Sequence, residues 1–422
     1  MKNSLIIKQV NVFDSEKGVF LPAKDILVEE RLITKVHDSI ELGKTNKIID
    51  CSGKYALPGL FECHGHLSFL YKEGENRDKT LQQFVSSGIT QVRDVGGSLH
   101  LLKELKKNIT NGTIMGPAIF YSGPMLERSP LTWEQYNKDL PGFTVPINTI
   151  EDAENIITKL VKEKASFVKT FFNWDKNVHL HLMQEAKKVR LSVTHDPGPP
   201  LYQSIPVEKA IEHGVRCIEH GHNPFQSILK KNFLTEHDQF FQTNPTAEKR
   251  KEYSNKILEM WKEAISLKKL SILCKKMVNN SVFFCPTMTV YKMELFEEYF
   301  DEKLPKDPKE IKRLEDVEDL TKFIVKEMIK NKVKILVGSD HYKPKFTLEE
   351  MISLQRLGLA ESEILKGATI YPAQWLGVEN QYGSIQPQKT ANILIVNKNP
   401  LENIENLYDP YLVLYKGVQI VQ

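Results

Sequence analysis

The feature that most constrains this chain is an apolar run that ends in two histidines, Leu57-Pro-Gly-Leu-Phe-Glu-Cys-His-Gly-His66. Residues i and i+2 of a strand point to the same face, so His64 and His66 can direct both imidazoles at one point. That geometry suits a metal ion. Two histidines at a strand end are also common as plain polar residues, so the metal site is indicated only if the rest of the chain supplies partners.

Four further candidate ligands stand at the C-terminal ends of short apolar runs rich in β-branched residues. The runs are Ser166-Phe-Val-Lys169, Leu191-Ser-Val-Thr-His195, Val215-Arg-Cys-Ile-Glu-His220 and Val333-Lys-Ile-Leu-Val-Gly-Ser-Asp340. Ligands at strand ends, with helical segments between the strands, are typical of a (β/α)8 barrel, whose chemistry lies at the C-terminal face. We therefore expect these four side chains to meet His64 and His66 in one site.

Both ends of the chain are expected to form short strands outside that barrel. Residues 4–56 contain several β-type runs separated by turn residues, and Ala391-Asn-Ile-Leu-Ile-Val396 and Tyr411-Leu-Val-Leu-Tyr415 repeat the pattern near the C-terminus. The chain has 422 residues, enough for a barrel of about 250 residues or more and an accessory domain. We predict a discontinuous β-sandwich from residues 1–56 and 381–422, and a barrel over residues 57–380.

Strands and helices alternate through the predicted barrel, with two long interruptions. Strand two is expected at Ile89–Asp94, and a helix is expected near residues 308–330. Residues 124–150 are rich in proline and aromatics, and residues 223–255 show no clear period before a helix expected over 254–279. Loops of such length are typically lids or binding loops, and the sequence leaves their roles open.

Composition narrows the class of protein. A formal net charge of +3, with lysines scattered along the chain, gives no basis for nucleic-acid binding. The cysteines are five in number and form no CxxC pair, which favours reduced thiols. The first apolar stretch is too short for a signal peptide, and no run is long enough to span a membrane. We expect a cytoplasmic protein that does not bind membranes.

Together these motifs resemble the amidohydrolase superfamily of metal-dependent hydrolases, over nearly the whole chain. Within it the chain looks most like the imidazolonepropionase-related and prolidase-like branch, which keeps a lysine on strand four. The matching pieces are Pro58-Gly-Leu-Phe-Glu-Cys-His-Gly-His66, Thr90-Gln-Val-Arg-Asp94, Val168-Lys169, His195, Ile218-Glu-His-Gly221, Gly338-Ser-Asp340 and Gly383-Ser-Ile-Gln-Pro-Gln-Lys-Thr-Ala-Asn-Ile-Leu-Ile-Val396.

The resemblance implies a centre of two divalent metal ions, most plausibly zinc. His64, His66 and Asp340 would bind one ion, and His195 and His220 the other. A protonated lysine offers no lone pair and is repelled by cations. Lys169 would therefore serve as a carboxylated lysine, whose carbamate bridges both ions; burial and adjacent cations disfavour its ammonium form.

The implied reaction is hydrolysis of an amide (peptide) bond in a small-molecule substrate such as a dipeptide, an N-acyl amino acid or a cyclic amide. A metal-bridging hydroxide would attack the carbonyl, with Asp340 as general base. Tyr291, in the loop that leaves strand seven, is a candidate substrate-binding residue. Gly123-Pro-Met-Leu-Glu stands where prolidase-like members carry Gly-Gly-His-Gly, which weakens the dipeptidase interpretation.

Other functions stay open at this point. The same site would hydrolyse a carboxyl or phosphate ester or a lactone. A mononuclear deaminase would resemble relatives without the strand-four lysine, so Lys169 argues against it. A non-catalytic barrel that only binds a ligand would be expected to lack a metal ligand, and none is missing. The sequence leaves the native metal, the substrate and the oligomeric state, including a homo-oligomer, undecided.

Overall fold

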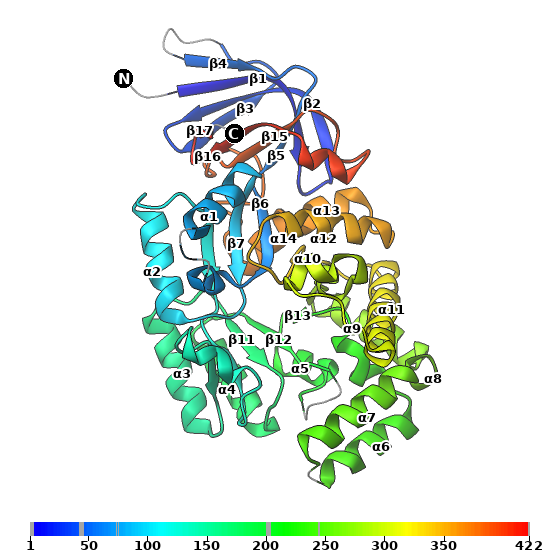
Figure 1. Cartoon of the computed structure of the whole chain (residues 1–422). Helices are drawn as coiled ribbons and strands as arrows, with labels where there is room; N and C mark the ends of the chain where they lie inside the picture. The colour runs from blue at the N-terminus through cyan, green and yellow to red at the C-terminus, as the bar shows by residue number, and fades with distance from the viewer. Residues whose placement is uncertain are drawn as a thin grey trace.

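One sheet at an end of the molecule combines strands from both ends of the chain (Figure 1). The structure is a computed structural model and describes residues 4–41, 46–72, 74, 76–199, 204–243 and 245–420. The strands of this sheet are β1 (Ser4–Asp14), β2 (Val19–Glu29), β3 (Leu32–His37), β4 (Asn46–Asp50), β5 (Tyr55–Pro58), β15 (Ile393–Val396), β16 (Pro410–Tyr415) and β17 (Val418–Ile420). The two ends join where β5 and β15 pair antiparallel, with Leu57 opposite Leu394. The predicted pooling of both ends is therefore observed; the domain boundaries stay predictions.

Two parallel sheets form the centre of the chain. The first contains β6 (Leu60–Gly65), β7 (Ile89–Asp94) and β8 (Ala118–Tyr121). The second contains β9 (Met125–Glu127), β10 (Thr144–Pro146), β11 (Val168–Phe171), β12 (Val193–Asp196), β13 (Cys217–Glu219) and β14 (Phe283–Cys285). Every residue of β6, β7, β11 and β12 is buried, as expected for parallel strands covered on both faces.

The run that ends at Asp340 lies between the two sheets without forming a regular strand. Ile335 makes an isolated parallel bridge to Phe284 of β14. On the other side, the backbone N–H of Cys63 in β6 donates to the carbonyl of Val337 at 2.9 Å. The chain thus has an α/β fold with parallel sheets, and the closed (β/α)8 barrel stays a prediction that these bonds favour.

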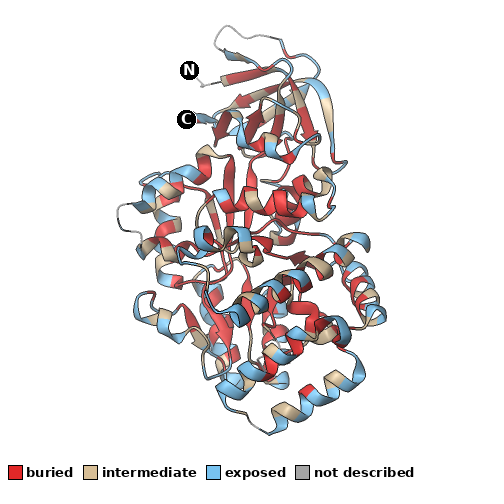
Figure 2. Cartoon of the chain, turned by 45° about the vertical axis from the view of Figure 1, so that its right-hand side comes forward, coloured by how far each residue is buried: buried red, intermediate tan, exposed pale blue. Residues whose placement is uncertain are grey.

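Helices surround the parallel strands, and their exposed faces point outward while the strands stay buried (Figure 2). They include α1 (Asn76–Ser86), α2 (Leu99–Thr110), α3 (Ile150–Lys162), α4 (Lys176–Lys188), α5 (Val207–His213), α11 (Pro308–Lys330), α12 (Lys345–Arg356), α13 (Glu361–Gly367) and α14 (Ile370–Leu376). At the start of α3, Thr149 accepts a hydrogen bond from the N–H of Asp152, whose carboxylate accepts one from the N–H of Thr149. Within the described ranges, no helix has both the length and the apolar character needed to cross a membrane.

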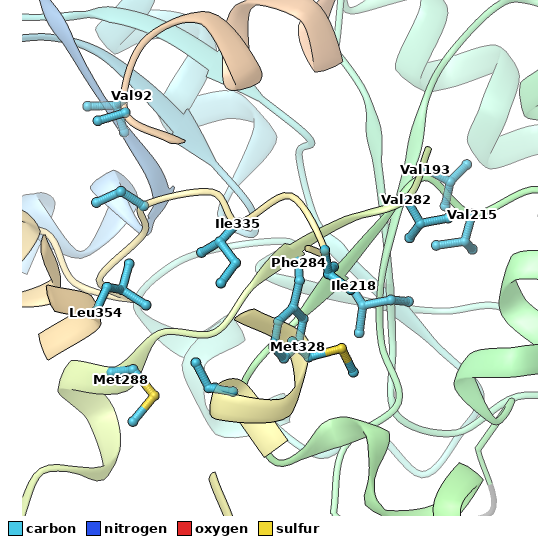
Figure 3. Close-up of a cluster of buried hydrophobic side chains, with 14 of the residues drawn as sticks. Val92, Val193, Val215, Ile218, Val282, Phe284, Met288, Met328, Ile335 and Leu354 are labelled. Atoms are coloured by element: carbon cyan, nitrogen blue, oxygen red, sulfur yellow. The ribbon is translucent and has the colours of Figure 1, made fainter. Parts of the chain in front are cut away.

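A dense apolar core fixes the strands that lead to the candidate site (Figure 3). Ile218 of β13, Phe284 of β14 and Met328 of α11 have no exposed surface, and Ile335 is only 2% exposed. Replacing a buried phenylalanine with alanine typically costs about 3–5 kcal/mol of stability. Packing at Phe284 therefore holds β13, β14 and residues 333–340 in register, and with them the histidine and the aspartate at their ends.

The sequence prediction was wrong about residues 223–279. In place of one helix over 254–279, the chain forms α7 (Ala247–Glu259), α8 (Trp261–Ala264) and α9 (Leu267–Asn279). Ile265 is extended, and the Ser266 side chain accepts from the N–H of Lys269 and so starts a new helix. The preceding stretch, expected to be irregular, contains the 3-10 helix η3 (Asn223–Ile228) and α6 (Lys231–Gln242). Figure 1 shows α6 and α7 together at one end of the molecule, opposite the sheet that combines strands from both ends of the chain.

Candidate metal centre

Three predicted ligands meet where β6 and residues 333–340 end. Oδ1 of Asp340 lies 2.9 Å from Nε2 of His66 and 3.2 Å from Nε2 of His64. Both imidazoles are almost fully buried. Burial raises the pKa of Asp340, but the neighbouring histidines, His64 above all, lower it more. The net pKa lies well below the ordinary value, so the carboxylate is ionised. The two histidines thus converge on one anionic oxygen, as the strand alternation predicts.

The far nitrogens of these histidines are held by the protein. Nδ1 of His66 donates to the carbonyl of Gly96 at 2.7 Å, and Nδ1 of His64 pairs with Oε2 of Glu219 at 2.8 Å. Burial opposes its ionisation, but Arg93 and His64 hold the pKa of Glu219 well below its usual range. Since an ionised carboxylate only accepts, Nδ1 of His64 donates the hydrogen bond to Glu219, which orients the ring with Nε2 toward the centre. The protein therefore occupies Nδ1 of each ring, and Nε2 is the nitrogen that each ring directs at Asp340.

His220 approaches the same centre from the end of β13. Its Nδ1 lies 3.9 Å from Oδ2 of Asp340 and 2.8 Å from the Thr287 hydroxyl. His64, His220 and Asp340 each place a ligand atom within 4.8 Å of the others. His220 and Asp340 also adopt left-handed backbone conformations, with φ of 65° and 60°. Such strain at non-glycine residues concentrates at functional sites.

Lys169 and Asp196 complete the cluster from β11 and β12. Nζ of Lys169 lies 3.5 Å from Oδ2 of Asp196, and Nε2 of His220 lies 3.1 Å from that same oxygen. Oδ1 of Asp196 accepts hydrogen bonds from Gly198 N–H and from the side chain of Asn223. Burial raises the pKa of Asp196, but the adjacent His220 and Lys169 lower it more, so the net pKa lies below its ordinary value. Asp196 is therefore an ionised carboxylate between a lysine and a histidine.

The structure does not bring His195 to this cluster, which corrects the sequence prediction. Its Nδ1 lies 2.8 Å from the Thr170 hydroxyl, and its Nε2 lies 2.9 Å from the carbonyl of Ile205. Its ring packs at 5.4 Å against His179 of α4, on the helix side of β12. Alternation along the strand is the physical cause: a residue next to His195 must face the other side, and Asp196 does. Asp196 was missed because, at the end of this strand, the prediction considered only the histidine.

The cluster stands at the base of a cavity of about 450 Å³ with mostly aromatic walls. The aromatic residues that line it are Phe69, Trp133, Tyr136, Phe143, Phe171, Phe172, Tyr291, Tyr299, Phe300 and Tyr342. Several belong to residues 124–150, where β9, β10 and the 3-10 helix η2 (Glu134–Lys138) replace the expected loop. A cavity of this size fits a small molecule with an apolar part.

Tyr291 lies in that wall, at the end of the 3-10 helix η4 (Met288–Tyr291). Burial, with the charges of Asp340 and Asp196, raises the pKa of Tyr291 well above its usual range, so its hydroxyl stays neutral. Its ring packs edge-on against His222 at 5.1 Å. The structure thus places the predicted substrate-binding residue at the cavity, with a hydroxyl that can donate a hydrogen bond.

The residues present fit divalent metal ions. Nε2 of His64 and Oδ2 of Asp196 are buried atoms that make no hydrogen bond of good geometry with any described residue. Leaving such groups unsatisfied is costly, which favours a bound cation. Neutral imidazole nitrogens and carboxylate oxygens are the donors that zinc and related ions take in proteins.

The chain is similar to known proteins in sequence and in fold. Residues 55–420 match the family model described as Amidohydrolase family. Among solved structures, a prolidase complexed with N-methylphosphonate-L-proline superposes with a TM-score of 0.75 at 19% identity, over 100% of both chains. A Xaa-Pro dipeptidase with methionine bound in its active site gives 0.75 at 18% identity, also over 100% of both chains. At these identities the likeness shows the fold alone.

Curated relatives match only a short stretch. Over 88 residues the chain is 36% identical to a 5-methylthioadenosine/S-adenosylhomocysteine deaminase of Carboxydothermus hydrogenoformans, which covers 20% of each protein. A similar match of 85 residues links it to the deaminase of that name from Dictyoglomus turgidum. The match thus spans about a fifth of the length of the curated relatives.

Proposed function

The chain belongs to the amidohydrolase family and is a metal-dependent hydrolase, and we propose that it cleaves an amide bond of a small substrate with two divalent metal ions. The observation that carries the proposal is the convergence of His64, His66 and His220 on Asp340 at the base of the aromatic cavity. Divalent ions held there would polarise the scissile carbonyl and lower the pKa of a coordinated water toward 7.

We propose that two groups of residues hold the ions. His64, His66 and Asp340 form one group, and His220 and Asp196 form the other. Asp196 takes the role that the sequence assigned to His195, because its Oδ2 is the atom that faces Nε2 of His220 and Nζ of Lys169. We propose zinc as the native ion, which the mixture of imidazole and carboxylate donors supports. We also propose a cytoplasmic location, which the free cysteines of the described residues support.

Lys169 would act between the two groups as a carbamate. Its side chain is buried, with 1% exposed surface, and its Nζ has a single carboxylate partner among the described residues, Asp196 at 3.5 Å. In the proposal the neutral amine adds to carbon dioxide with loss of one proton, and the resulting anion supplies two oxygens. An anion at this place offsets the charge of two cations that a lysine ammonium would repel.

Asp340 would move the proton in the reaction. Its carboxylate lies beside His64 and His66 and borders the cavity, so it is within reach of a water attacking a substrate seated there. It would accept the proton of that water and pass it to the leaving nitrogen. The neutral hydroxyl of Tyr291 would orient the substrate carbonyl by donating a hydrogen bond.

A second candidate function is deamination, which the short similarity to the deaminases favours. Lys169 distinguishes the two, because deamination by a single metal ion needs no bridging anion. Ammonia release from 5-methylthioadenosine is the measurement that supports the deaminase.

The experiment that tests the proposed function is a hydrolysis screen of N-acyl amino acids, dipeptides and cyclic amides with zinc- or manganese-loaded protein. We expect turnover of at least one amide, loss of that turnover with a chelator, and its return with metal. The Asp340→Asn variant serves as the control for contaminating hydrolases. Deamination without any amide hydrolysis would contradict the proposal.

A further inference from the structure

A second cavity adjoins the aromatic one. Its volume is about 490 Å³. The residues shared by the two linings are Pro199, His222, Val290, Tyr291 and Phe300. The second cavity therefore lies directly behind Tyr291, the residue proposed to orient the substrate.

Its outer walls come from α7, α10 (Phe296–Phe300) and α11. The helix α7 belongs to the stretch that the sequence analysis singled out as a long interruption of the barrel pattern. Its side of the cavity carries Arg250 and Lys251, and α11 contributes Arg313. Among the described residues that line this cavity there is no aspartate or glutamate, whereas Asp196, Asp301 and Asp340 line the first. The lining of the second cavity thus carries cationic side chains without a carboxylate beside them.

The positive charges of the second cavity are poorly compensated. Within the described part of the chain, no carboxylate lies within 4 Å of the side chain of Arg250 or Lys251, although Arg250 is half-buried. Arg313 has one acidic neighbour, Glu310, at 3.7 Å, and its side chain is 34% exposed. The acidic residues of α7, Glu248 and Glu252 among them, are exposed and do not line the cavity. A half-buried guanidinium with unused donors is suited to a carboxylate.

The boundary between the cavities is also polar. Nδ1 of His222 is buried and has no hydrogen-bond partner among the described residues, and the ring packs against Tyr291. Leu258, Leu314 and Val317 also line the second cavity and make part of its wall apolar. This arrangement accepts a short carbon chain that ends in an anion.

We propose that the cavity between α7, α10 and α11 binds the carboxylate of the substrate through Arg250 and Arg313, while an apolar or aromatic group fills the first cavity. The inference rests on the proposed function and narrows it: the substrate is an amide with an apolar part and a free carboxylate. N-acyl amino acids have this chemistry.

The test compares N-acyl amino acids with the same compounds capped as neutral amides. The variants are Arg250→Gln, Arg313→Gln and the double substitution. Arg190→Gln, in the loop between α4 and β12 at the opposite ends of the strands, is the matched control. Binding is measured by calorimetry on the metal-loaded Asp340→Asn protein, so that it does not depend on turnover. We expect the double variant to weaken binding of the acids by about 10- to 100-fold, the scale of a lost charge-assisted hydrogen bond or two, with the neutral amides and the control unchanged.

The outcomes separate this inference from the proposed function. Charge-selective binding that depends on Arg250 and Arg313, without turnover of any amide, would support the inference and contradict the function. Turnover by wild type, together with equal binding of acids and neutral amides by the Asp340→Asn protein with and without the double substitution, would overturn the inference and leave the function standing. Failure of every acid in the panel to bind the Asp340→Asn protein with both arginines intact would also overturn the inference.

Discussion

His195 and Asp196 are consecutive residues of β12 whose side chains face opposite sides of the strand. Oδ2 of Asp196 lies 3.1 Å from Nε2 of His220, in the cluster, whereas both nitrogens of His195 bond to Thr170 and Ile205 outside it. The two residues thus offer a matched pair: one is proposed to hold metal, and the other is equally buried but turned toward the helices.

Asp196→Ala should therefore lower the metal content of the purified protein by about one ion per chain, whereas His195→Gln should keep it. The histidine variant should instead be less stable, by about 1–3 kcal/mol, because it disturbs two buried hydrogen bonds. Metal analysis by mass spectrometry and urea unfolding provide the two readouts. Loss of metal in the His195 variant with retention in the Asp196 variant would show that His195 is the ligand.

Replacing Asp340 with asparagine should separate its two roles. Asparagine keeps an oxygen at the position that faces His64 and His66 but cannot accept the proton. We expect most of the metal to remain while kcat falls by roughly 10²-fold or more, the scale of a lost general base. Metal content and steady-state kinetics on the same preparation provide the check. Near-normal turnover would mean that Asp340 serves only as a ligand.

The carbamate at Lys169 predicts chemical rescue. Lys169→Ala should lose one ion and nearly all activity, and millimolar formate, acetate or propionate should restore part of both by placing a carboxylate in the vacated space. Millimolar affinity corresponds to about −4 kcal/mol, reasonable for a small anion between cations. Wild type is the control and should gain nothing. A Lys169→Ala protein with full metal and full turnover would exclude a bridging role.

Glu350 of α12 makes stability depend on pH. It is fully buried, and one oxygen accepts from the N–H of Thr289 at 2.9 Å while the other has no partner among the described residues. Burial raises its pKa from 4.5 to about 8. The folded protein therefore holds this proton to higher pH than the unfolded chain, so the contribution to stability is full below about pH 4.5 and is lost as pH rises toward about 8.

Glu350→Gln removes that ionisation but keeps an acceptor oxygen. The free energy of unfolding of this variant should fall less between about pH 5 and about pH 8 than that of wild type, by a few kcal/mol at most. Urea unfolding at the two pH values measures the difference, and Glu302→Gln, at an exposed position, is the control. Parallel pH dependences of wild type and the Glu350 variant would contradict the assignment.

The regular elements were predictable where the local pattern was strong. β7 runs over Ile89–Asp94 and α11 over Pro308–Lys330, as the sequence predicted, because one is a fully buried run and the other a long periodic helix with a capping aspartate at 307. The break at Ile265 and Ser266 carries no glycine or proline, and its single sequence signal is Ser266, a serine that can begin a helix. Helix α6 was not predicted. His237 is its one buried residue, so the helix has no regular stripe of buried apolar side chains that the sequence pattern could reveal.

The sequence predicted that His64 and His66 share one face of their strand. It did not predict which face of β12 points into the site. Two residues of separation are enough to place His64 and His66 on one face, whatever the neighbouring strands do. Which face of β12 points inward is decided by its register with β11, where Lys169 lies opposite Thr194 and Phe171 opposite Asp196. A shift of one residue exchanges the two faces, and the sequence around His195 does not specify it. The same limit applies to the second cavity, whose arginines come from helices distant in the chain.

The proposed mechanism requires a centre of two metal ions, and the metal content of the wild-type protein tests that requirement. Protein purified without chelator, then reconstituted with zinc or manganese and bicarbonate, should contain close to two divalent ions per chain. His64→Ala should lower that number. A wild-type value that stays at one ion or fewer after reconstitution would contradict the two-ion centre built on His64, His66, Lys169, Asp196, His220 and Asp340.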